Sequence, residues 1–310
     1  MEYSTVDLLT SSKSFAMDEI VDTIVAMCRQ ESIGYSVVDY ISKNVDRKLD
    51  IDRDCRKKMV LWSYQVIDFC KFNRETVEIA MSYLDRFLCT PTGLHALYDR
   101  SVYQLAAMAS LYTAVKIHEP EAMDPALVSK LSRGTYTPNE IEEMEFIIIQ
   151  SLRWKLNPPT TLSFIREFIN MTSIEALDEP TRILVYELCK FQAEFATSNN
   201  DFVEVQASEK AYHSFINSLE CLHVDPKVIH YIANMIEHAI SIYASPHNHL
   251  CGNSIQVQSY LYSALIQHPK IRAITEAIVS PNKYADEHHQ TRQLSTLSVS
   301  PRSSIIKIDS

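Results

Sequence analysis

The stretch Tyr83-Leu84-Asp85-Arg86-Phe87-Leu88 decides the fold class, because it places charged residues at the end of an apolar helical pattern. Apolar residues recur at the three- and four-residue spacing of one helix face: Val77, Ala80, Met81, Leu84 and Leu88. Asp85 lies at the edge of this face, where a carboxylate is costly to bury unless a cation meets it. The pattern therefore predicts an amphipathic helix that carries a charge in need of a partner.

Two further charged residues occupy similar positions downstream. Lys116 shares a helical row with Leu105, Ala109 and Tyr112. Glu145 shares one with Ile141, Ile148 and Leu152. Three charged residues among apolar neighbours, on three helices, require partners either within the fold or in another protein.

The composition favours an all-helical protein. The chain has 310 residues with only 4 Gly, and 46% of its residues are hydrophobic, which is enough for one large or two ordinary domains. Long segments with a 3.6-residue period, and no run of short alternating strands, predict helices throughout. No apolar run reaches 18 residues and the first residues lack a signal-peptide pattern, so we expect no membrane partner.

The net charge bears on the kind of partner, and the cysteines bear on the cellular compartment. The formal net charge of -10 argues against nucleic acid as the main partner. The seven cysteines are scattered without a Cys-x-x-Cys pair, which is typical of reduced thiols in a cytosolic or nuclear protein. His247-Asn248-His249-Leu250-Cys251 contains metal-binding residue types, but no second ligand cluster lies nearby in sequence. We therefore expect no metal site, no cofactor and no catalytic residues.

Periodicity and capping signals predict a repeated helical plan. Asn73 is expected to cap one helix, Asp124-Pro125 to open a short one, and Thr137-Pro138-Asn139-Glu140 to open another as a capping box. In the first half, helices are expected over residues 17–29, 37–45, 56–72, 73–88, 101–117, a short segment from 125, and 138–154. The helix over 101–117 is rich in small residues, so it is expected to be central.

A linker signal separates this half from the next. Asn157-Pro158-Pro159 ends the helical pattern, because proline cannot continue a helix. Further helices are expected over residues 162–169, 180–197, 203–222, 226–243 and 255–278. The predicted organisation is an N-terminal extension with a helix (1–50), two helical domains (51–157 and 158–279) and a disordered Ser-rich tail (280–310).

Several groups of residues follow the order and spacing of a known family. They are Cys55-Arg56-Lys57-Lys58-Met59-Val60-Leu61-Trp62 with Ala80 to Leu88, Gln104 to Ala107, Ala114 to Lys116, and Met144-Glu145 with Leu152-Arg153-Trp154-Lys155-Leu156. Over about residues 37–157 the chain resembles the cyclin box, and its local sequence is most similar to that of D-type cyclins. The second half is similar mainly in its helix plan. The resemblance implies an all-α fold of two tandem five-helix cyclin-fold domains.

The resemblance also implies a function, that of a non-catalytic subunit that activates a cyclin-dependent Ser/Thr protein kinase. Lys116 and Glu145 match the two family residues that pair with each other and hydrogen-bond the kinase. Ile117, Ile149 and Trp154 fall where the family places apolar kinase contacts. A purely internal salt bridge, and ordinary core packing of the apolar residues, remain alternative interpretations.

Two further sets of positions follow from the family. Arg56 and Asp85 match the buried pair that locks the first two helices together. A substrate- and inhibitor-docking patch would consist of Cys55, Met59, Trp62 and Gln104, although Cys55 replaces a methionine and Lys58 stands where an apolar residue is usual. Whether this patch binds peptides stays open, because Trp62 alone is typical of a core residue.

The sequence also contains a candidate regulatory site, and it leaves alternative functions open. Ser300, before Pro301, is a candidate phosphosite for a proline-directed kinase. The function expected is control of cell-cycle progression, in the nucleus and cytoplasm. The alternatives are a transcription-associated cyclin-fold scaffold and an enzyme or helical-repeat protein whose likeness is accidental.

Overall fold

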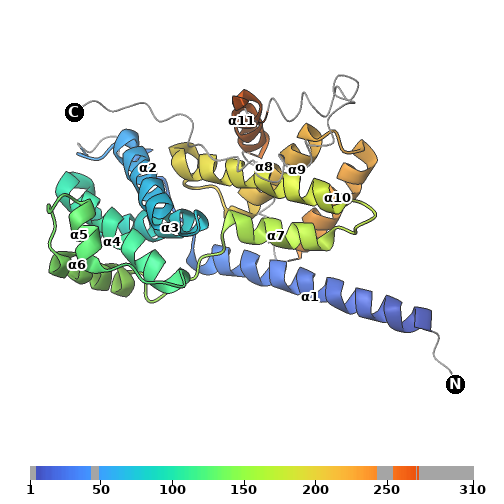
Figure 1. Cartoon of the computed structure of the whole chain (residues 1–310), viewed down its shortest axis with the longest axis horizontal. Helices are drawn as coiled ribbons and strands as arrows, with labels where there is room; N and C mark the ends of the chain where they lie inside the picture. The colour runs from blue at the N-terminus through green and yellow to red at the C-terminus, as the bar shows by residue number, and fades with distance from the viewer. Residues whose placement is uncertain (1–4, 43–48, 243–253, 270, 272–310) are drawn as a thin grey trace. The chain divides into compact units, whose positions relative to one another are not determined.

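The structure, a computed structural model, describes residues 5–42, 49–242, 254–269 and 271, with side chains in the first helix from Met17 onward. Over these residues the chain is all-helical and contains no strand (Figure 1). None of the described helices combines the length and the apolar character that crossing a membrane requires. The α-helices are α1 (Thr5–Gly34), α2 (Arg53–Cys70), α3 (Glu75–Leu88), α4 (Arg100–His118), α5 (Pro125–Leu131), α6 (Pro138–Ser151), α7 (Thr161–Met171), α8 (Glu179–Ser198), α9 (Ala207–Cys221), α10 (Pro226–Ser241) and α11 (Ser254–Gln267), with short 3-10 helices η2 (Leu94–Tyr98) and η3 (Asn200–Phe202).

The chain divides into two compact units. The first unit consists of Gln30–Thr160 together with Ala196–Gln206. The second unit consists of Met1–Arg29, Thr161–Phe195 and Ala207–Ser310. The contiguous boundaries predicted at residues 50, 157 and 279 stay a prediction.

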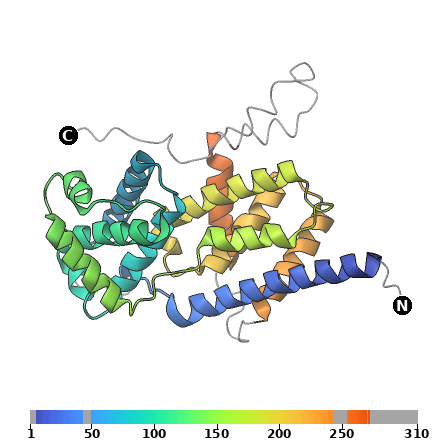
Figure 2. The same cartoon turned by 60° about the horizontal axis from the view of Figure 1, so that its bottom comes forward.

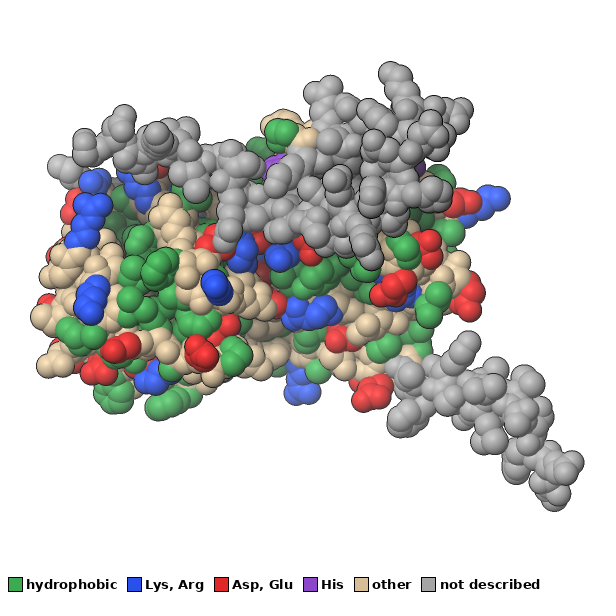
Figure 3. All heavy atoms as spheres, in the orientation of Figure 1, with side chains coloured by type: hydrophobic (Ala, Val, Ile, Leu, Met, Phe, Trp, Pro, Cys, Tyr) green, Lys and Arg blue, Asp and Glu red, His purple; other side chains and the backbone are tan. Residues whose placement is uncertain are grey.

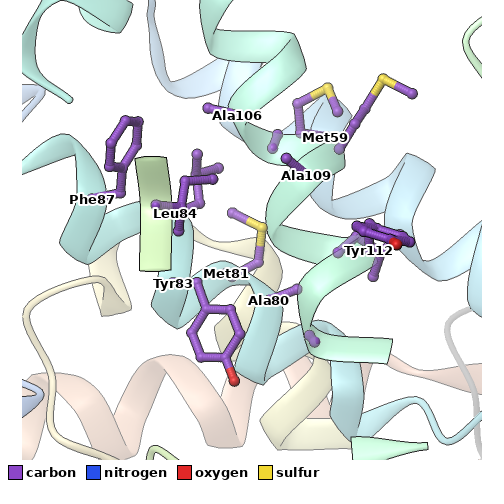
Figure 4. Packing of buried hydrophobic residues seen from close by; sticks show 14 of the residues in the cluster. Met59, Ala80, Met81, Tyr83, Leu84, Phe87, Ala106, Ala109 and Tyr112 are labelled. Atoms are coloured by element: carbon purple, nitrogen blue, oxygen red, sulfur yellow. The ribbon is translucent and has the colours of Figure 1, made fainter. Parts of the chain in front are cut away.

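Helix α4 is the centre of the first unit. It packs against α2, α3, α5 and α6. Its contact face is built from small side chains that let the neighbouring helices approach, and these are buried: Ala106, Ala107, Ala109, Ser110 and Ala114. Figure 4 shows how side chains from α2, α3 and α4 gather in one core, with Met59, Met81, Leu84 and Tyr112 among them. The core of this unit is thus organised around a helix of low side-chain volume.

Helix ends in the first unit follow the local capping rules. The Thr137 side chain accepts a hydrogen bond from the Glu140 N–H, and the Glu140 carboxylate accepts one from the Thr137 N–H, which completes the capping box of α6. The side chains of Asp52, Asp99 and Asp124 cap α2, α4 and α5 by accepting hydrogen bonds from backbone N–H groups of the first turn. These caps satisfy N–H groups that have no partner within a helix.

The second unit repeats this plan around α9, which packs against α7, α10 and α11. Small side chains are again buried along the central helix, at Ser208, Ala211, Ser214 and Ser218. Phe168 of α7 lies edge-on to Phe215 of α9, with ring centroids 5.9 Å apart. Figure 2 shows α7 to α11 from a second direction.

The structure corrects several predicted boundaries. Residues 37–41 form no helix, because the Asp39 carboxylate accepts hydrogen bonds from the N–H groups of Ile41 and Ser42 and holds a turn there. Helix α1 extends on both sides of the predicted 17–29. Helix α3 begins at Glu75 rather than at Asn73, whose carbonyl and side chain instead form the preceding turn. Helix α6 ends at Ser151, three residues before the predicted Trp154.

Two more segments differ from prediction in the second half of the chain. Helix α9 begins at Ala207, later than the predicted Val203, and residues 200–202 before it form the separate 3-10 helix η3. Helix α11 ends at Gln267, and residues 272–278 of the predicted helix lie outside the described residues. The predicted tail, the candidate phosphosite Ser300 and the segment His247–Cys251 also lie outside them.

Candidate functional site

A buried ion pair joins α2 to α3. The Arg56 guanidinium meets the Asp85 carboxylate through two hydrogen bonds, Nε to Oδ1 at 3.0 Å and Nη2 to Oδ2 at 2.7 Å. Arg56 is 3% exposed and Asp85 is 5% exposed. The Tyr40 hydroxyl donates a third hydrogen bond, at 2.8 Å, to Asp85 Oδ1. The carboxylate that the sequence placed at the edge of an apolar face is therefore fully compensated.

The same guanidinium also holds a distant segment of the first unit. Its Nη1 donates to the Thr197 carbonyl at 3.0 Å and to Asn200 Oδ1 at 3.4 Å. The Asn200 side chain in turn donates to the Arg53 carbonyl at 2.9 Å. Burial by itself lowers the pKa of Arg56, but Asp85 beside it raises the pKa above its ordinary value, so the group stays charged. Arg56 thus ties together α2, α3 and the segment around η3.

A second ion pair, between α4 and α6, is only partly buried. Lys116 Nζ lies 3.1 Å from Glu145 Oε2. The Lys116 side chain is 49% exposed, whereas the Glu145 side chain is 9% exposed. The hydrogen bond to Glu145 raises the pKa of Lys116, and the ammonium also lies 5.5 Å from the centre of the Tyr112 ring. The pair links two helices and still presents an ammonium group to solvent.

Exposed apolar side chains lie on α4, on α6 and on the residues directly after α6. Ile117, next to Lys116, is 45% exposed, and Trp154 is 69% exposed, while Ile149 is half-buried. Phe146, next to Glu145, is 55% exposed and was not singled out from the sequence. Core packing therefore does not account for Ile117 or Trp154. Figure 3 shows hydrophobic side chains at the surface among charged ones over the part of the chain that holds α2 to α6.

The backbone at Trp154 is unusual for its residue types. Arg153 and Trp154 have φ angles of 52° and 60°, in the left-handed region that favours glycine. The Trp154 N–H bonds the Ile149 carbonyl at 3.1 Å, and the Lys155 N–H bonds the Leu152 carbonyl at 3.1 Å. Such conformations persist only where the surroundings hold them, and they cluster at functional sites.

The four residues of the predicted docking patch have different surroundings. Met59 is buried, Cys55 and Trp62 are half-buried against the core, and Gln104 is exposed. Gln104 Oε1 accepts a hydrogen bond from the Tyr136 hydroxyl at 3.2 Å. Burial raises the pKa of the Cys55 thiol, which disfavours the reactive thiolate. Met59 thus belongs to the core, Cys55 and Trp62 pack against the core while partly exposed, and Gln104 lies at the surface.

Helix α2 also carries an exposed ion pair. Lys58, where the family usually has an apolar residue, pairs with Asp54 one turn earlier at 2.8 Å. Both side chains are mostly exposed, at 68% and 64%. Leu61 is also exposed, at 46%. Lys58, Asp54 and Leu61 are thus exposed positions of α2, the helix that also carries Cys55, Met59 and Trp62.

Residues 22–157 match the model of the family described as cyclin, N-terminal domain. This part of the chain is therefore similar to the N-terminal domain of cyclins. Cyclin-D4-1 of Arabidopsis thaliana is 27% identical to it over 217 residues, which cover 68% of this chain and 67% of that protein. Cyclin-D4-2 of the same plant is 30% identical over 200 residues, which cover 63% of this chain and 62% of that protein. The predicted similarity to D-type cyclins is thus confirmed.

A solved structure is similar to this chain in fold. The X-ray structure of a viral cyclin from herpesvirus saimiri has a TM-score of 0.57 and 14% sequence identity, covering 79% of this chain and 96% of that chain. At this identity the likeness concerns the fold, and it confirms the predicted all-α cyclin fold. Arg56, Asp85, Lys116, Glu145 and Trp154 all lie within the matched cyclin box.

Proposed function

We propose that this protein is a regulatory subunit that binds and activates a cyclin-dependent Ser/Thr protein kinase. The observation that carries the proposal is the Lys116–Glu145 pair, partly open to solvent and adjacent in sequence to the exposed side chains of Ile117 and Phe146. An interface centre typically combines apolar or aromatic anchors with a few oriented polar groups. The pair and its neighbours fit that description.

The mechanism would be a population shift. In protein kinases, the helix that carries the catalytic glutamate must swing inward so that this glutamate pairs with the phosphate-positioning lysine. A subunit that binds this arrangement more tightly than the inactive one raises its population without taking part in the chemistry. Lys116 supplies a cation with unused donors, because an ammonium has three N–H groups and Glu145 takes one. The chain itself would perform no catalysis.

The proposal is tested by co-purification of the tagged full chain with a protein kinase, followed by a kinase assay. The Lys116→Ala, Glu145→Ala double variant is expected to lose most of the associated kinase activity. Its control is the Lys58→Ala, Asp54→Ala double variant. This variant removes another ion pair of the same unit, one whose two side chains are both mostly exposed. The proposal fails if no kinase co-purifies, or if both double variants retain the same activity.

The same preparation separates this function from the alternative scaffold. A transcription-associated scaffold of this fold would bind nucleic acid with an affinity that falls steeply with salt concentration. Salt-sensitive binding to nucleic acid, without kinase activity, would favour that alternative. The formal net charge of -10 argues against it.

The proposal extends to the docking of peptides on this protein. We propose that Cys55, Met59, Trp62 and Gln104 form a docking surface for substrate or inhibitor peptides. A Gln104→Ala variant, which changes the most exposed of the four, is expected to slow phosphorylation of docking-dependent substrates while leaving a short peptide substrate unaffected. Equal rates on both substrates would contradict it.

A role in cell-cycle progression, in the nucleus and cytoplasm, is part of the same proposal. It predicts that the level of the protein, or of its kinase activity, changes through a synchronised division. Imaging of the tagged full chain would show both compartments. A constant level and activity through division would count against the cell-cycle role while leaving kinase activation intact.

A further inference from the structure

Arg86 is a buried cation that no carboxylate of the described residues pairs with. It follows Asp85 directly, but Asp85 bonds Arg56, and Arg86 is only 6% exposed. Its Nε donates to the Ser82 carbonyl one turn earlier on α3, at 3.1 Å. Burial lowers the pKa of Arg86 to about 10, so the group is still charged at neutral pH. A buried charge of this kind requires compensation from neutral groups.

The compensation comes from two aromatic rings and a carbonyl beyond α6. The guanidinium carbon lies 4.5 Å from the centre of the Tyr35 ring and 5.7 Å from that of Tyr83. Arg86 Nη1 donates to the Lys155 carbonyl at 3.0 Å. Hydrogen bonds from a charged donor are roughly twice as strong as neutral ones. Arg86 therefore holds the backbone immediately after Trp154.

The next two carbonyls along the chain are held in the same way. The Tyr83 hydroxyl donates to the Leu156 carbonyl, and His118 Nε2 lies 3.0 Å from the same oxygen. Gln30 Nε2 donates to the Asn157 carbonyl at 2.8 Å. Three consecutive carbonyls, of residues 155 to 157, are thus bound by side chains from α1, α3 and α4. We call these interactions the carbonyl clamp.

The clamp lies directly after the exposed Trp154. The Trp154 side chain is 69% exposed, so packing alone cannot hold it. Its left-handed backbone, and that of Arg153, would relax if the chain on one side were free. On one side the turn is bonded to the last carbonyls of α6, and on the other it is bonded to the clamp.

We infer that Arg86 is a positioning residue, which holds the Lys155 carbonyl and thereby orients Trp154 toward a protein partner. That the partner is a kinase rests on the function proposed above, whereas the orientation of Trp154 does not. Residues that order an exposed anchor before binding raise affinity by lowering the entropy lost in the complex. The inference therefore has two separate consequences, one in the free protein and one in the complex.

The first experiment measures Trp154 in the free full chain. The chain has 2 tryptophans, so a Trp62→Phe background leaves Trp154 as the only one. Time-resolved fluorescence anisotropy is expected to show a larger fast local component in Arg86→Met than in the background. Lys155→Ala is the matched control, because it removes the side chain but keeps the carbonyl that Arg86 binds. It is expected to leave the anisotropy decay unchanged.

The Arg86→Lys variant covers the case in which Arg86→Met does not fold. Lysine keeps the charge but cannot donate from Nε and Nη1 at once, or stack a planar group on Tyr35. It is expected to fold, by circular dichroism, and still to loosen Trp154. An unchanged anisotropy decay in a folded Arg86 variant overturns the inference, whatever the kinase assay shows.

The second experiment measures affinity for the kinase that co-purifies with the chain. An immobilised side chain costs about 2- to 12-fold in affinity when it must be ordered on binding, so Arg86→Met is expected to weaken binding by that factor. In a Trp154→Ala background the same change is expected to have no effect, because Arg86 acts through Trp154. Equal weakening in both backgrounds overturns the inference. If Trp154→Ala itself leaves affinity unchanged, the proposed binding site fails while the anisotropy result still stands.

Discussion

Removing the Asp85 carboxylate is the sharpest test of how the first unit is held together. The change takes away three hydrogen-bond acceptor contacts at once, two to Arg56 and one to Tyr40. Arg56 would keep only the Thr197 carbonyl and Asn200 as partners while remaining buried. Stranding one member of a buried ion pair typically costs about 3–5 kcal/mol, which is the loss expected for Asp85→Ala.

Tryptophan fluorescence can follow the unfolding of the first unit separately. Both tryptophans, Trp62 and Trp154, lie in the first unit, so their fluorescence during urea unfolding reports on that unit. Asp54→Ala is the control, because it breaks an i,i+4 ion pair whose two side chains are mostly exposed, so its loss is expected to change stability little. The double variant Arg56→Met, Asp85→Leu is expected to lose less than Asp85→Ala alone, since no charge is left buried. The reasoning is refuted if Asp85→Ala costs no more than Asp54→Ala.

Three further outcomes follow from other features. Thr137→Ala removes the capping box of α6 and is expected to cost about 1 kcal/mol in urea unfolding, and an unchanged midpoint would contradict this. Ala109→Leu forces a larger side chain into the α4 core, so it is expected to cost about 1–3 kcal/mol, and a neutral effect would mean that the helices around α4 are not closely packed. Burial lowers the pKa of His213 to about 4 from 6.5, so the neutral form stabilises the second unit above pH 6.5. That stability is expected to fall by up to about 1.4 kcal/mol per pH unit as the pH drops from 6.5 toward 4, measured by circular dichroism, and His213→Gln is expected to lose this slope.

Sequence reasoning predicted the helices of the cyclin box well because their signals are local. Thr137 to Glu140, and Asp124 with Pro125, specify helix starts through bonds within four residues. The segment over 37–45 was predicted wrongly because its apolar pattern is short, and a turn around Asp39 replaces helix over the residues described there. Periodicity does not report such side-chain bonds to the backbone.

Candidate residues were harder to assign where the sequence is apolar throughout. In Phe146-Ile147-Ile148-Ile149 every side chain is hydrophobic, so the pattern does not tell which one faces the core. The structure buries Ile148 completely and leaves Phe146 55% exposed. The position of Phe146 directly after Glu145 was the only signal that could have indicated it. The contacts of Arg56 to Thr197 and Asn200 had no signal at all, because they join residues more than 140 positions apart.

The sequence by itself determined that the chain is helical, where most helices begin, and that Asp85, Lys116 and Glu145 needed partners. Only the tertiary structure decided which partner each charge meets. Asp85 and Arg86 are adjacent, yet Asp85 bonds Arg56 while Arg86 bonds the Lys155 carbonyl. Successive residues of a helix point about 100° apart, so neighbours in sequence face different elements. Which elements those are depends on how the helices pack, which no local pattern contains.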